Sequence, residues 1–342
     1  MKSAEYAFLI GKIRGLASAL LTLDQYKSIL GCKSLIELVS VLKSTSYKQV
    51  LEKEEWSNYE ELRKVIAGTF SRFFTSILKE IPTKDRDFIK AYQLLFEARS
   101  LVAAFRVAFG LDDLMVKAQV LPSGVLNVAD YQRILKSSEL TMSTAWISNR
   151  ELREVSIKVI KETTKIRSPL PLQAIVEIAL NSCLTKLEDL PEDKQIPLRA
   201  LLGYQVDAAN IITVIRAVHD HVHPRLGESY LIKPFYMVSL DKLRAALGCQ
   251  SVEAAQFLVM EKYKEIPEEL LSEGTIEAFE YGFLHRLAER GRIAMSGYPF
   301  QVRTIIGFFE LRWIEARNVN LIFFGMEKGA KPDGILKRII VA

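Results

Sequence analysis

A helical spacing of apolar residues recurs at regular intervals along the chain. In residues 97–109 the apolar side chains fall at the i, i+3, i+4 and i+7 positions that share one face of an α-helix. Residues 207–218 repeat this spacing, and residues 315–324 repeat it less cleanly. Each copy opens with an acid, at Glu97, Asp207 and Glu315. These acids are 207 − 97 = 110 and 315 − 207 = 108 residues apart, which predicts three similar helices.

The N-terminus carries a fourth copy of this pattern. In three of the four copies an arginine follows the acid by nine residues, in the pairs Glu5/Arg14, Glu97/Arg106 and Asp207/Arg216. The copy that opens at Glu315 has Phe324 at this position. Two interpretations are open. The acid and arginine either cap helices and form salt bridges between units, or they belong to a charged inner surface that binds another protein.

The segments that follow these helices repeat as well. Residues 23–34 and 240–251 both begin with Leu-Asp and contain Gly-Cys, at an offset of 240 − 23 = 217. The stretch 42–47 matches 258–263 at an offset of 258 − 42 = 216, and a shorter middle copy covers 128–135. Several segments that agree on one period indicate a triplicated unit. We therefore predict three helical repeat units, at 1–118, 119–228 and 229–342.

Almost every other segment has helical periodicity, whereas the alternation typical of strands is scarce. Gly and Pro fall mostly at the junctions between helical segments. The predicted fold class is all-α, with three pseudo-repeated helical domains arranged as a funnel or ring. The longer predicted helices cover 4–21, 58–80, 85–110, 149–162, 170–188, 194–218, 275–290 and 299–326, and shorter ones cover 24–30, 34–43, 128–136, 239–247 and 251–261.

The composition is that of a protein with well-filled cores. Apolar residues make up 49% of the chain and charged residues 25%, with a formal net charge of +5. Acidic and basic residues are interleaved, as on solvated helix faces, and no basic stripe predicts a nucleic-acid partner. We assign the aromatic residues of the repeated helices to the core: Phe70, Phe73, Phe74, Phe308, Phe309, Trp313 and Phe323.

No apolar run approaches the ~20 residues of a membrane-spanning helix. The N-terminus also lacks the apolar stretch of a cleaved leader. We therefore expect membrane association only through another protein. The cysteines, Cys32, Cys183 and Cys249, lie far apart in sequence, and we expect small buried thiols in a reducing compartment.

The sequence contains no phosphate-binding loop, no Gly-x-Gly-x-x-Gly and no Gly-x-Ser-x-Gly. It therefore predicts no catalytic residue and no cofactor. The segment 219–223 combines histidines with an aspartate, and His219 and His223 share a helix face as a weak candidate for a metal site. However, this segment lies at a helix end before a proline, and no further ligand is visible beside it. We interpret His285, which stands alone, as structural.

The order of the motifs resembles a known family. The C subunit in the central stalk of archaeal A-type ATPases, which is named d in eukaryotic V-type ATPases, has a similar N-terminal pattern. The resemblance is carried by Tyr6, Ile13-Arg14-Gly15, Leu20-Leu21-Thr22, Asp24-Gln25-Tyr26, Leu30, Cys32, Leu35, Glu37, Leu42, Thr45 and Tyr47. Near the other end, Glu315-x-x-Asn318-Val319 is similar to the acid-x-x-Asn-Ile/Val of the family's closing helix. The chain departs from the family at Phe324 and at Lys233-Pro234-Phe235, where a Pro-Gly turn is usual.

The resemblance implies a non-catalytic rotor component of an H⁺ or Na⁺ transporting ATPase, with no cofactor. Such a component is a funnel seated on the proteolipid c-ring, at the cytoplasmic face of the membrane. It receives the D and F subunits of the rotating shaft and transmits torque. On this basis we expect eight partner-binding residues at the inner surface of the funnel: Arg14, Arg99, Arg106, Asp207, Arg216, Glu315, Arg317 and Asn318.

Two other functions stay open from the sequence. A free-standing helical scaffold could bind another protein or peptide in its concave face, and co-purification with ATPase subunits distinguishes it from a rotor component. A metal-dependent hydrolase could be built on the histidine cluster, and elemental analysis for a stoichiometric transition metal tests that function.

Overall fold

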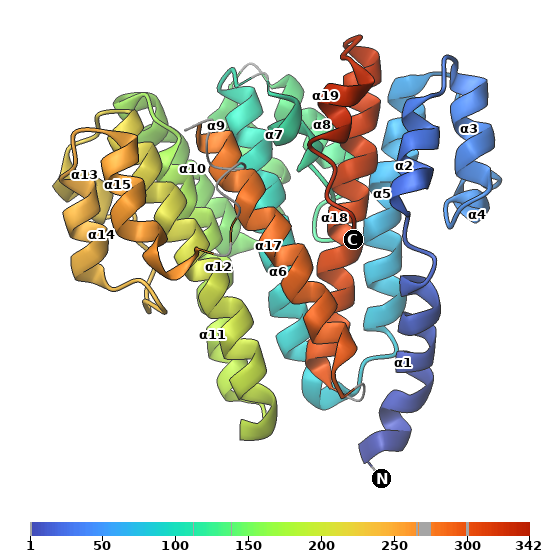
Figure 1. The fold of residues 1–342 in the computed structure, drawn as a ribbon, viewed down its shortest axis with the longest axis horizontal. Coiled ribbons are helices and arrows are strands. Elements are labelled where there is room, and N and C mark those ends of the chain that lie inside the picture. Colours follow the sequence, from blue (N-terminus) through green and yellow to red (C-terminus); the bar gives the residue numbers. More distant parts are fainter. Residues whose placement is uncertain (1, 112, 138, 265, 267–274, 299–300) are drawn as a thin grey trace. The chain divides into compact units, whose positions relative to one another are not determined.

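The computed structural model describes residues 2–111, 113–137, 139–264, 266, 275–298 and 301–342, and Figure 1 shows their fold. The chain is 74% helical, and the described residues include no strand. The predicted all-α class is confirmed, whereas the three-repeat arrangement and the funnel stay predictions. The chain divides into two compact units, of which the first joins 1–136 to 287–342 and the second covers 137–286.

The first unit is discontinuous in sequence because its N-terminal helices pack around the C-terminal helix α18 (Val302–Glu327). Helix α18 contacts α1, α5, α7 and α19 (Figure 1). The other helices of the first unit are α1 (Lys2–Ala17), α2 (Leu23–Leu30), α3 (Leu35–Lys43), α4 (Lys48–Leu51), α5 (Tyr59–Leu78), α6 (Thr83–Ala108), α7 (Leu114–Ala118), α8 (Val128–Lys136) and α19 (Pro332–Leu336).

Aromatic rings form the centre of this unit. Phe74 of α5 stacks on Phe309 of α18, with ring centroids 4.0 Å apart. Phe70 meets Phe96 of α6 edge to face at 5.1 Å, and Trp313 is fully buried beside them. The assignment of the aromatic set to the core is confirmed, although Phe73 is only partly buried. Helix α18 is buried around its whole circumference, and its buried residues include charged and amide side chains as well as apolar ones.

The second unit surrounds α12 (Glu192–His219), which packs against α11, α14 and α15. Tyr204 of α12 lies edge to face with Tyr263 at 5.7 Å, and its hydroxyl donates to the carbonyl of Phe283 at 2.8 Å. The other helices of this unit are α9 (Leu140–Ser143), α10 (Arg150–Ile166), α11 (Gln173–Glu188), α13 (Pro224–Glu228), α14 (Leu240–Leu247) and α15 (Val252–Val259), with 3-10 turns η1 (Thr144–Trp146), η2 (Leu170–Leu172) and η3 (Met260–Lys262). Helix α17 (Ile276–Ser296) crosses the boundary between the units.

The repeated segments fold alike, because the same residue types cap their helices. Thr22 and Ser34 accept a hydrogen bond from the third residue of α2 and α3, and Ser239 and Ser251 do the same for α14 and α15. Both pairs are 217 residues apart, since 239 − 22 and 251 − 34 give the same number. Most predicted helix ends agree with the structure to within a few residues, because caps of this kind are readable in the sequence.

Two expectations need correction. Cys183 is buried, but Cys32 and Cys249 are only partly buried, and all three thiols are free. Helix α12 is long and apolar enough to cross a membrane by length and composition, with a mean hydropathy of 1.2 over its best window, whereas the sequence pattern predicted no such run. However, 89% of that window is buried inside the protein, which is typical of a core helix.

Candidate functional site

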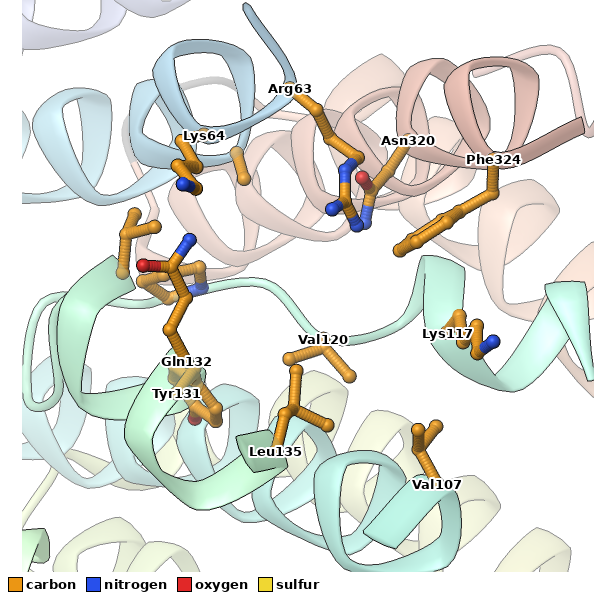
Figure 2. Close-up of a pocket in the computed structure, with 13 residues that line it drawn as sticks. Arg63, Lys64, Val107, Lys117, Val120, Tyr131, Gln132, Leu135, Asn320 and Phe324 are labelled. Atoms are coloured by element: carbon orange, nitrogen blue, oxygen red, sulfur yellow. The ribbon is translucent and has the colours of Figure 1, made fainter. Parts of the chain in front are cut away.

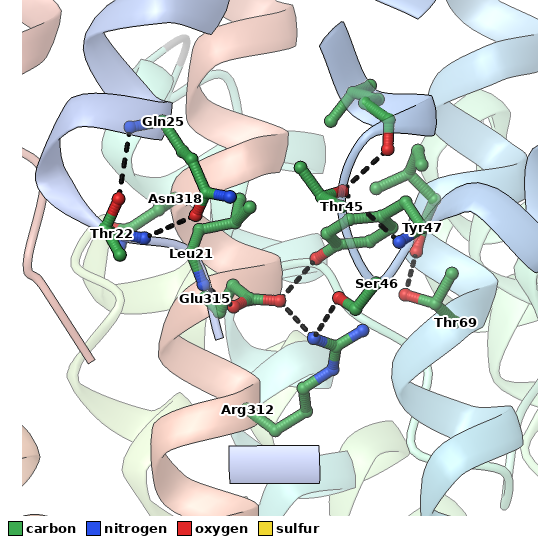
Figure 3. Close-up of polar contacts among 12 residues, drawn as sticks. Leu21, Thr22, Gln25, Thr45, Ser46, Tyr47, Thr69, Arg312, Glu315 and Asn318 are labelled. Atoms are coloured by element: carbon green, nitrogen blue, oxygen red, sulfur yellow. Dashed lines mark hydrogen bonds and ion pairs between the residues drawn. The ribbon is translucent and has the colours of Figure 1, made fainter. Parts of the chain in front are cut away.

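The carboxylate of Glu315 on α18 is completely buried and fully engaged with hydrogen-bond donors (Figure 3). The backbone N–H of Leu21, just before α2, donates to Oε2 at 2.6 Å. The hydroxyl of Tyr47 donates to Oε1 at 3.0 Å. Arg312, one turn earlier on α18, forms a close ion pair with the same carboxylate. Glu315 therefore joins the last long helix of the chain to the first helical hairpin.

Arg312 was not among the residues predicted from the sequence. Its side chain is 2% exposed, and its guanidinium lies over the ring of Phe73 at 4.2 Å and over that of Tyr47 at 5.0 Å. Glu315 raises the pKa of Arg312 against the opposing effect of burial, so the arginine is charged inside the core. Its position three residues before Glu315, between the apolar Leu311 and Trp313, was the signal that could have identified it.

Asp207 on α12 occupies an equivalent position in the second unit. It is completely buried and accepts from the backbone N–H groups of Met237 at 2.7 Å and Val238 at 3.2 Å, and from the hydroxyl of Tyr263 at 2.7 Å. Burial raises the pKa of Asp207, although these donors lower it in part. Asp207 therefore ties the long helix to the segment that leads into α14.

Glu97 on α6 is the third buried carboxylate of this kind. It accepts from the Ser123 hydroxyl at 2.5 Å, from the backbone N–H of Leu126 and, in a short contact, from the hydroxyl of Tyr131. Burial raises the pKa of Glu97, and the same donors oppose that rise. Glu97 thereby joins α6 to the loop before α8.

The three carboxylates share one arrangement, which we call the carboxylate pins, at Glu97, Asp207 and Glu315. Each accepts from a tyrosine hydroxyl and from the N–H of the residue just before a helix cap. These N–H donors belong to Leu126, Val238 and Leu21, which precede the caps Asn127, Ser239 and Thr22. A charged group with this many donors is stable only in one geometry. All three carboxylates are 0% exposed.

A second contact recurs three residues after each pin. Asn210 donates to the carbonyl of Ile232 at 2.9 Å and accepts from its N–H at 2.7 Å. Asn318 makes the same two bonds to Ile340, at 2.5 and 3.3 Å. In the first copy Ser100 exchanges both bonds with the backbone of Leu121, at 2.7 and 3.2 Å. The chain therefore leaves each long helix and returns to it about 22 residues later, at an equivalent position.

Four of the predicted contact residues, Asp207, Glu315, Arg317 and Asn318, are 0% exposed in this chain. Arg317 donates to the carbonyl of Arg338 at 2.8 Å and to the amide oxygen of Asn318 at 2.9 Å. It therefore holds the C-terminal segment against α18. Whether any of the predicted set acts in partner binding stays a prediction.

The remaining predicted residues differ in exposure. Arg14 on α1 is exposed, while the side chain of its partner in the pattern, Glu5, lies outside the described part of the structure. Arg99 pairs with the buried Glu310 at 3.0 Å, an acid that the sequence pattern did not identify. Arg216 pairs with Glu280 at 2.8 Å instead of with Asp207. Arg106 is buried, with 5% of its surface exposed.

The weak metal candidate gains no support from the described residues. His219 and His223 are both exposed. His219 contacts Asp220 at 2.8 Å, and His223 caps α13 by accepting from the N–H of Arg225. Within the described part of the chain, no group of three His, Cys, Asp or Glu residues is placed to hold a metal ion.

Comparison with known proteins identifies the family. The family described as "ATP synthase (C/AC39) subunit" matches residues 9–338. The chain belongs to this family. Its curated relatives include the C subunits of two A-type ATP synthases. That of Methanocaldococcus jannaschii is 20% identical over 98% of this chain and 86% of the relative. That of Thermococcus onnurineus is 22% identical over 98% of this chain and 90% of the relative. The equivalent protein of Pyrococcus abyssi is 20% identical over 99% of this chain and 91% of the relative.

Membership of the ATP synthase C/AC39 family confirms the resemblance found in the sequence and places the chain in a rotary ATPase. The C subunit is a peripheral component of a membrane-associated complex. The buried α12 agrees with this, because its apolar surface is covered by the protein itself.

The pins predict a specific pH dependence. Because burial raises the folded-state pKa of Glu97, the folded protein binds a proton there before the unfolded chain does. The stability that Glu97 contributes therefore rises as pH falls through the raised pKa, and it levels off below the pKa that Glu97 has in the unfolded chain. In urea titrations at several pH values, wild type should gain stability relative to Glu97→Gln as pH is lowered from neutral.

The exposed Glu154 is a control whose contribution to stability should change with pH in the opposite direction. Arg150 lowers the pKa of Glu154, so its contribution is lost as pH falls, and wild type should lose stability relative to Glu154→Gln over the same range. Equal slopes for both variants would contradict the buried, ionisable state of Glu97.

Proposed function

We propose that this chain is a non-catalytic rotor component that couples the D and F subunits of the shaft to the proteolipid ring of an A-type or V-type ATPase. In this role it performs no chemistry. It carries torque between ATP turnover and ion movement, at the cytoplasmic face of the membrane, and reaches the membrane only through the ring. Membership of the C/AC39 family over residues 9–338 supports the assignment.

The carboxylate pins are the observation that carries the proposal. A body that transmits torque must resist deformation, and close packing resists it only as long as the elements keep their register. Each pin fixes a long helix against the segment that leads into a shorter helix, through several hydrogen bonds to its carboxylate. The pins therefore give the protein the stiffness that a mechanical coupler requires.

Among the residues expected at the partner contact, we propose Arg14 for direct contact, because its side chain is exposed. We assign Asp207, Glu315, Arg317 and Asn318 to the shape of the body instead, because they are buried. An Arg14→Glu variant should weaken association with the other rotor subunits. Arg150→Glu, a change of the same type at another exposed arginine, on α10, is the matched control.

Omission of the chain from a reconstituted complex tests the proposal. Vesicles that contain the other subunits should hydrolyse ATP without ion uptake, and addition of the chain should restore uptake. Uptake should be followed with both a pH-sensitive dye and a Na⁺ flux assay, so that either coupling ion is detected. Full ATP-driven uptake without the chain would contradict the coupling role.

A further inference from the structure

A pocket of about 200 Å³ lies beside the C-terminal half of α18 (Figure 2). Its walls come from α5, α6, α7, α8 and α18, which all belong to the first unit. Val107, Val120, Leu135 and Phe324 provide an apolar lining. At ~30 Å³ per water molecule the volume is equivalent to about seven waters, and it is below the range of pockets that hold drug-sized ligands.

The charged residues of this pocket all have the same sign. Arg63, Lys64 and Lys117 line it, and the described lining includes no carboxylate. Lys64 pairs with Glu60 at 2.9 Å near the surface. Arg63 lies over the ring of Phe324 at 4.0 Å, and within the described residues it makes no hydrogen bond or ion pair. Phe324 is the residue that replaces the arginine of the repeated acid–arginine pattern.

Two buried polar atoms of the pocket lack partners. They are Nε of Arg63, a donor, and Oδ1 of Asn320, an acceptor. Asn320 is only 4% exposed, and its amide nitrogen is held by the carbonyl of Ala118 at 3.2 Å. An unpartnered Nε recurs at other arginines of this chain, so the buried amide oxygen of Asn320 is the more informative atom: it leaves an acceptor open to a donor in the pocket. Burial, together with the like charges of Lys328 and Arg63, lowers the pKa of Lys117, and the carboxylate of Glu327 offsets this shift only in part. A negative group of a ligand beside Lys117 would therefore be favourable.

We propose that this pocket binds a compact organic anion, a carboxylate or phosphate monoester on a ring-sized apolar body. The anionic group meets Arg63, Lys64 and Lys117. The apolar body lies against Phe324, Leu135 and the valines, and a hydroxyl of the ligand donates to Oδ1 of Asn320. Tyr131, the hydroxyl donor to the Glu97 pin, also lines the pocket, so a bound anion stabilises that part of the first unit.

Saturation-transfer NMR on the whole chain tests the proposal with 3-hydroxybenzoate and 3-hydroxyphenyl phosphate as probes. The neutral probe of similar shape is 3-hydroxybenzyl alcohol. At least one of the anions should bind, and the alcohol should bind roughly tenfold more weakly or not at all, because charge-assisted hydrogen bonds are absent. Arg63→Gln should lower the anion affinity by about tenfold or more, and Arg63→Lys should lower it less.

Gln132→Glu is a second variant, because it adds a negative charge to the lining without a change in size. It should weaken anion binding and leave the circular dichroism spectrum unchanged. Arg150→Gln, in the second unit, is the matched control and should bind as wild type does. The proposal is overturned if neither anion binds at millimolar concentration. Equal binding of the alcohol, or unchanged binding in both Arg63→Gln and Gln132→Glu, overturns it as well.

Discussion

Replacement of Glu315 with alanine is expected to lower the free energy of unfolding of the first unit by about 3–5 kcal/mol. Three donors lose their acceptor, and the guanidinium of Arg312 stays buried without an opposite charge. The guanidinium would keep only the hydroxyl of Ser46 as a hydrogen-bond acceptor, at 3.3 Å, since Nε and Nη2 lack partners. Urea unfolding, with hydrogen exchange in α2 and α18 to follow the first unit, measures this loss.

Further variants separate the causes of this loss. Glu315→Gln keeps an acceptor for Leu21 and Tyr47 but removes the charge. If the buried charge of Arg312 dominates the loss, Glu315→Gln should be nearly as destabilising as Glu315→Ala. The double variant Arg312→Met/Glu315→Leu should recover part of the stability, because no charge stays buried. Glu154→Ala breaks an exposed ion pair of α10 and should change little. A loss no larger at Glu315 than at Glu154 would contradict the pin.

Gly307→Leu is expected to destabilise the protein by about 3 kcal/mol, and Gly307→Ala by about 1–3 kcal/mol. Gly307 lies where α18 crosses α17, and a Cβ there would be 2.6 Å from the carbonyl oxygen of Gly291 and 3.0 Å from Cβ of Ala294. The first of these atoms belongs to the backbone, so the two helices must move apart. Thermal unfolding followed by circular dichroism measures the change.

Gly11 is the matched control on an exposed helix face. A Cβ on this residue of α1 meets nothing within 4 Å. Gly11→Ala should therefore leave stability unchanged or raise it by up to about 1 kcal/mol, because alanine is the better helix former. Similar results for alanine at positions 11 and 307 would show that the two helices do not approach as closely as the structure describes.

Much of the fold was readable from the sequence because the signals are local. Caps such as Thr22 and Ser239, and apolar periodicity within a single helix, require no knowledge of distant residues. The repeated pattern also singled out the three residues that became pins, Glu97, Asp207 and Glu315. Since the pattern contains both an acid and an arginine, salt bridges between units were one natural interpretation.

The partners of the pins could not be predicted, because they are distant in sequence. Leu21 donates to a carboxylate 294 residues away, and no local pattern links them. Asp207 is bound by backbone N–H groups, which every residue except proline carries, and Arg216 pairs with Glu280 instead. The division into two compact units also depends on these long-range contacts, since α18 packs among N-terminal helices. The partner-binding set inferred from the resemblance therefore included residues that are buried.

We propose that this chain turns with the rotor. The direct measurement attaches a bead to the chain in a complex whose catalytic part is fixed to a surface, and follows the bead while ATP is supplied. We expect stepwise rotation at the rate of a bead attached to the D subunit of the shaft. A bead on this chain that stays still while the bead on the shaft turns would contradict it.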